Sequence, residues 1–113
     1  MYIDMCEKET ADEYTKNYEI EIKTANLIER VEKINKEALE IMLNKNKDYG
    51  AKIDNIALTG IVGIAVRLID KVSRVYSLTA KDPDVKDESM RDTLLDIINY
   101  ANIGVQLIDG VWK

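Results

Sequence analysis

The sequence predicts an all-α protein, a small helical bundle with three helices and a further N-terminal one. Apolar residues recur at three- and four-residue spacing in three long segments, which is the helical period. The single proline lies in a loop rich in aspartate, outside those segments. With 113 residues, 46% of them hydrophobic and 33% charged, the chain fits one soluble domain with a modest core.

Each predicted helix has recognisable end signals. The first covers residues 24–46 and is followed by Gly50, as expected at a helix C-terminus. The second opens at Thr59 or Gly60 and runs to about residue 78, with an apolar face broad enough for a central helix. Residues 79–87, "TAKDPDVKD", form a break. Ser89 with Asp92 then resembles a capping box, and Gly110 ends the third helix.

The first 23 residues are the least regular part. Thr10 followed by Glu13 matches a capping box and predicts a helix through Tyr14 and Tyr18. Tyr18, Ile20 and Ile22 also alternate with polar residues, as in a strand. We favour the helix, since a single strand would have no partner in this sequence. The predicted organisation is an N-terminal extension, 1–23, and a helical domain, 24–113.

Composition excludes several functions. The net charge of −5 argues against binding to duplex nucleic acid, because counterion release needs a basic surface. No segment is long and apolar enough to cross a membrane, and the N-terminus carries acids where a signal peptide carries lysines. A cytoplasmic location is the expectation. Cys6 is the only cysteine and there is no histidine, so we expect neither an internal disulfide nor a thiol–imidazole pair.

Two helices carry charged rows of one spacing. Asp92, Asp96 and Asn99 stand at i, i+4 and i+7, on one face of the last helix. Asp96 lies among Leu94, Leu95, Ile97 and Ile98, where a carboxylate is costly to desolvate without a partner. The central helix carries a similar row, made of Arg67, Asp70, Lys71 and Arg74.

Two interpretations fit these rows. In the simpler one they are salt bridges along helix surfaces, each worth tenths of a kcal/mol. In the functional one, antiparallel packing brings Asp70 to Asp92 and Asp96, and their oxygens hold Mg²⁺. The cations of the central helix then meet phosphate oxygens in the same cleft. Ion-pair networks imitate such sites, so spacing alone leaves both open.

Three stretches, "KNKDYG" (45–50), "VRLIDKVSRVYSL" (66–78) and "VKDESMRDTLLDIINYA" (85–101), resemble a known family in order and approximate spacing. It is the first nucleotide-modification-associated domain family, found largely in phages and bacteria. The resemblance covers about residues 38–105. That family is in turn similar to the MazG-like all-α nucleoside triphosphate pyrophosphatases. Those are helical oligomers, usually dimers, that use Mg²⁺ on acidic residues of two adjacent helices.

The resemblance implies a role for each candidate residue. It implies that the metal ligands are Asp70, Asp92 and Asp96, with Asn99 as a nearby polar contact. Lys47 would contact phosphate and Tyr49 the base or sugar. Arg67, Lys71 and Arg74 would stabilise phosphate charge. Without histidine, the general base would be a carboxylate, Glu40 or Glu88, or a metal-bound hydroxide.

The sequence departs from the MazG pattern at two positions. Arg67 stands where that pattern has the first acid of an "ExxE" motif on the central helix. Thr93, three residues before Asp96, stands where the pattern has the first acid of an "ExxD" motif on the last helix. The leading expectation is a Mg²⁺-dependent nucleoside triphosphate pyrophosphohydrolase. The alternative is a non-catalytic phage-type sponge, which holds a nucleotide or cyclic nucleotide signal in an interhelical or intersubunit pocket. Such broad apolar faces also predict a homo-oligomer, a dimer or larger.

Overall fold

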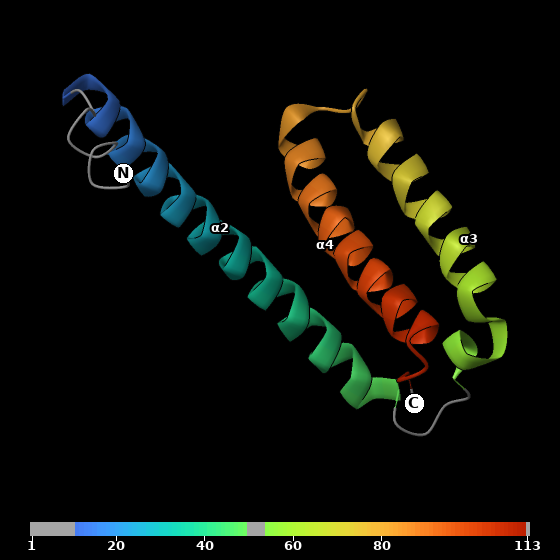
Figure 1. Ribbon diagram of the computed structural model, residues 1–113. Helices are drawn as coiled ribbons and strands as arrows, with labels where there is room; N and C mark the ends of the chain where they lie inside the picture. Colours follow the sequence, from blue (N-terminus) through green and yellow to red (C-terminus); the bar gives the residue numbers. More distant parts are fainter. Residues whose placement is uncertain (1–10, 50–53, 113) are drawn as a thin grey trace. The chain divides into compact units, whose positions relative to one another are not determined.

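The computed structural model describes residues 11–49 and 54–112, with all their side chains except those of 47–49 and 83–88. It contains three α-helices, α2 (Ala11–Tyr49), α3 (Asn55–Leu78) and α4 (Pro83–Ile108) (Figure 1). The described ranges contain no strand, which confirms the all-α prediction. Within these ranges no helix has the length and apolar character needed to span a membrane.

The chain divides into two compact units, residues 1–33 and 34–113. In the first unit the expected N-terminal helix is present from Ala11, and it continues through Lys23 without interruption. The strand alternative for Tyr18 to Ile22 is therefore excluded. Thr10, the expected cap, lies outside the described residues, and the proposed domain boundary at residue 23 stays a prediction.

In the second unit α3 and α4 form an antiparallel pair, joined by a turn at residues 79–82 (Figure 1). In the described part of this unit the core is small; its buried apolar residues there are Ala38, Ile64, Leu78, Leu95 and Ile103. Gly104 faces α3, and a Cβ there would lie 3.4 Å from Ile64 Cγ2. A methyl group at this position would therefore make ordinary van der Waals contact with α3.

The start of α3 differs from the prediction. The helix begins at Asn55, before the predicted Thr59 or Gly60, because Asp54 caps it. The Asp54 carboxylate accepts hydrogen bonds from the backbone of Ile56 (2.9 Å) and Ala57 (3.1 Å). Its other oxygen accepts one from Trp112 Nε1 (2.9 Å). The hydrogen bond from Ala57 is the largest cause that holds the pKa of Asp54 below its ordinary value.

The start of α4 is also earlier than predicted. Pro83 opens the helix, so the break is confined to residues 79–82 and Ser89 lies inside the helix. Proline suits this first position because its nitrogen needs no partner there and its φ is already helical. The Ser89 carbonyl accepts a hydrogen bond from Thr93 Oγ1 (2.7 Å), which satisfies a buried hydroxyl. Near its end, as predicted, α4 stops before Gly110, whose φ is +75°.

Gly60 bends α3. Its φ of +60° and ψ of −150° lie in a region that only glycine occupies readily. No described atom lies within 4 Å of a Cβ added at this position, so the backbone conformation is the reason that glycine is favoured here. The regular part of α3 that carries the charged row follows this bend.

We predict that Gly60→Ala lowers the free energy of unfolding by about 1–3 kcal/mol, because alanine is strained at this φ and ψ. The matched control is Gly104→Ala, where the backbone is helical and the added methyl group meets Ile64 and Ile61 of α3 at ordinary contact distance. Urea denaturation followed by circular dichroism measures both. Equal stability of Gly60→Ala and the wild type would contradict the role given to this bend.

Candidate functional site

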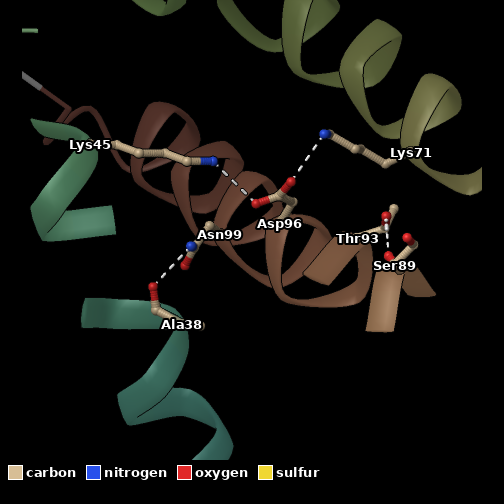
Figure 2. Close-up of polar contacts among 7 residues, drawn as sticks. All are labelled: Ala38, Lys45, Lys71, Ser89, Thr93, Asp96 and Asn99. Atoms are coloured by element: carbon tan, nitrogen blue, oxygen red, sulfur yellow. Dashed lines mark hydrogen bonds and ion pairs between the residues drawn. The ribbon is translucent and has the colours of Figure 1, made fainter. Parts of the chain in front are cut away.

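Asp96 joins three helices in the second unit. Its Oδ1 accepts a hydrogen bond from Lys45 Nζ of α2 (3.2 Å), and its Oδ2 accepts one from Lys71 Nζ of α3 (3.0 Å) (Figure 2). The Asp96 side chain is only 19% exposed. Burial by itself raises the pKa of Asp96, but the two lysines outweigh it and hold that pKa below its ordinary value.

Two further polar contacts link α2 to α4. Asn99 Nδ2 donates a hydrogen bond to the backbone carbonyl of Ala38 (2.9 Å), also visible in Figure 2. Arg91 forms a two-pronged ion pair with Glu37, with distances of 2.5 and 2.6 Å, and this pairing raises the pKa of the guanidinium. Polar groups therefore fix the C-terminal part of α2 against α4.

A hollow of about 380 Å³ lies beside Asp96, between α3 and α4. Its lining residues are Arg67, Asp70, Lys71, Arg74 and Tyr100. Three cations thus face one carboxylate and one aromatic ring, so the local charge is positive in a chain of net charge −5. Such a cluster attracts anions, and the planar guanidinium groups suit phosphate oxygens in particular.

Arg67 is the most unusual member of this cluster. Its guanidinium carbon lies 5.9 Å from the centre of the Tyr100 ring, which places the cation over the aromatic face. Its Nη1 is buried and has no hydrogen-bond partner in the described part of the chain. A buried donor left unpaired costs about 1–3 kcal/mol, so this nitrogen favours any ligand that supplies an acceptor.

The three carboxylates predicted to bind Mg²⁺ are not brought together. Among the residues that the structure describes, no group of three or more acids, histidines or cysteines is arranged to hold a metal ion. Asp70 lines the hollow, both oxygens of Asp96 accept from lysines, and Asp92 is exposed. A hard cation needs several free oxygen ligands, so this donor set does not fit Mg²⁺. The Mg²⁺ cofactor remains a prediction.

The other predicted residues have separate places. Glu40 lies on α2 beside a second hollow of about 630 Å³, which Leu43, Asn44 and Asn46 also line. Asn99 is in the site region, but its amide is engaged with Ala38. Lys47, Tyr49 and Glu88 have side chains outside those that the structure describes, so their predicted roles stay predictions.

Sequence reasoning missed two residues of the site. Tyr100 stands four residues after Asp96 and therefore shares its helix face. This position and its aromatic ring are the sequence signals that could have identified it as a site residue. Lys45 is the first residue of "KNKDYG", but its partner lies 51 residues away. No local pattern indicates such a contact.

The fold and the site define an all-α protein with a cationic hollow between two antiparallel helices. The family model described as nucleotide modification associated domain 1 matches residues 45–107, more than half of the chain. The chain belongs to this family, as the sequence resemblance indicated. Comparisons with curated proteins and with solved structures found no match. The further similarity to MazG-like pyrophosphatases stays a prediction.

We predict that Asp96→Asn lowers the free energy of unfolding at pH 7 by about 1–2 kcal/mol, because two hydrogen bonds to a charged carboxylate are weakened. The folded pKa of Asp96 is depressed, so its stabilisation is present above the unfolded pKa and lost as pH falls through the folded one. The variant should therefore lose part of the acid sensitivity that the wild type shows below about pH 4.

Denaturant titrations between acid and neutral pH give this profile. Asp92→Asn is the matched control, since Asp92 is exposed and the same charge is removed one helical turn away. If both variants show the same stability and the same acid profile, Asp96 does not hold the three helices together.

Proposed function

We propose that this protein binds a nucleotide, with the ligand's phosphates in the hollow lined by Arg67, Lys71 and Arg74, and that the binding needs no metal ion. The observation that carries the proposal is the buried Nη1 of Arg67, which has no acceptor within the described structure and lies among further cations. A phosphate oxygen is the acceptor that best matches a guanidinium in both charge and geometry.

The remaining lining residues suit the rest of a nucleotide. Tyr100 offers an aromatic ring beside the cations, against which a base can pack. Asp70 offers a carboxylate that can accept hydrogen bonds from ribose hydroxyl groups. The hollow's volume, about 380 Å³, lies within the range of small-molecule sites. Membership of a nucleotide-modification-associated family supports the same ligand class.

The competing function is the Mg²⁺-dependent pyrophosphohydrolase predicted from the sequence. It requires carboxylates that are free to bind metal, whereas the oxygens of Asp96 are occupied by Lys45 and Lys71. Asp70 is the one carboxylate that lines the described hollow. The arrangement of charges therefore favours binding without turnover, the sponge alternative.

We predict that a nucleotide binds in EDTA and is recovered unchanged. Isothermal titration calorimetry with nucleoside mono- and triphosphates and cyclic dinucleotides measures the affinity, and chromatography of the denatured sample identifies the recovered ligand. Arg67→Ala should weaken binding about 10- to 100-fold, because one charge-assisted hydrogen-bond donor is lost. Binding should also weaken as salt increases, since the site is open to solvent.

Arg30→Ala is the control, an exposed arginine in the other unit of the chain. Three results would contradict the proposal. One is that no nucleotide in the panel binds in EDTA. Another is that Arg67→Ala binds as tightly as the wild type. The third is release of pyrophosphate that requires added Mg²⁺, which would establish the competing function.

A further inference from the structure

The α3–α4 pair exposes a continuous apolar face away from the cationic hollow. On α3 the exposed apolar side chains recur at three- and four-residue spacing: Val62, Val66, Ile69, Val72 and Tyr76. On α4 a second row stands at intervals of seven, four and three residues, which also keep to one helix face: Leu94, Ala101, Val105 and Ile108. Spacing of this kind is the signature of a helix-bundle seam.

Helix geometry places the two rows on the same face of the pair. On each helix successive residues turn by about 100°, so the exposed row is displaced by roughly 110–120° from the row that faces the other helix. When each helix is viewed from its own N-terminus, the exposed row lies on the same rotational side of the contact row in both helices. Because α3 and α4 run antiparallel, the two rows open on one side. Arg67, Asp70 and Arg74 are displaced in the opposite sense on α3, toward the hollow.

The exposure of these side chains is large. It reaches 70% at Val62, 75% at Ile108 and 80% at Tyr76. The rows together expose an apolar area on the order of 800 Å², more than the 300–600 Å² of the largest patch on a typical monomer. That area is what each partner buries in a stable interface of standard size.

We propose that this face, named here the outer face of α3 and α4, is the interface with a second copy of the same chain. Two parallel rows are wider than one partner helix can cover, whereas the same two rows of a second copy match them in width. The rows contain no charged residue, so the face meets its own copy without like-charge repulsion. Two copies related by a twofold axis would then form a four-helix bundle.

This inference is independent of the nucleotide proposal, since the hollow lies on the other side of α3. It specifies the surface through which the copies of the homo-oligomer expected from the sequence would associate. Two helices from each copy would bury the rows that the small core of the monomer leaves exposed.

Analytical ultracentrifugation of the full chain at about 10–100 µM tests the proposal. The wild type should sediment as a dimer or a larger assembly of dimers. The double variant Ile69→Glu/Val105→Glu should raise the dissociation constant at least 100-fold, because each copy would bury two unpaired carboxylates. Asn26→Glu adds the same charge at an exposed position of α2, in the other unit of the chain, and should leave the assembly unchanged.

The milder pair Ile69→Thr/Val105→Thr keeps β-branched side chains and guards against loss of fold, which circular dichroism monitors. It should raise the dissociation constant at least tenfold. A monomeric wild type would overturn the proposal. So would a folded glutamate or threonine double variant that associates as tightly as the wild type, or dissociation caused equally by Asn26→Glu.

Discussion

A carboxylate at the meeting point of three helices links the parts of the second unit. Asp96 lies on α4 and accepts hydrogen bonds from Lys45 of α2 and Lys71 of α3. Among the residues described in this unit the buried apolar core is small, so packing there has little area with which to hold α2. Polar contacts therefore determine where the C-terminal part of α2 lies, and Asp96 is the contact that also reaches α3.

The same carboxylate organises the charge of the candidate site. Asp96 partly neutralises Lys71, which also lines the hollow, while Arg67 and Arg74 contribute further positive charge. An acidic chain can bind an anion when cations gather locally in this way, because the field at the site depends on near charges more than on net charge. The α3 helix thus has three functions on three faces: packing on α4, lining the hollow and exposing an apolar row.

The sequence was sufficient to predict the helices because their apolar periodicity is long and their end signals are strong. It placed Arg67, Asp70, Lys71 and Arg74 on one helix face, and the structure brings these four to one hollow. Helix starts were less predictable, since Asp54 and Pro83 act as start signals that the apolar pattern does not contain. The capping-box pattern at Ser89 was misleading because Ser89 lies inside α4, which begins at Pro83.

The partner of Asp96 could not be predicted from local spacing. Its stacking with Asp92 suggested a shared cation, and the hydrophobic residues beside it required some positive partner. A metal ion and two lysine ammonium groups both satisfy that requirement, and the linear sequence does not distinguish between them. Only the folded chain brings Lys45, which is 51 residues away, to the same carboxylate. The distinction between a metal site and an anion site therefore depends on tertiary contacts.

Heteronuclear NMR of the Arg67 guanidinium during titration with a nucleotide in EDTA tests the central claim most directly. The account predicts that the Nη1 protons of Arg67, unpaired within the described structure of the free protein, become protected from exchange and shift as phosphate binds. The Tyr100 ring signals should shift at the same ligand concentrations. A bound nucleotide that leaves the signals of both residues unchanged would contradict the account.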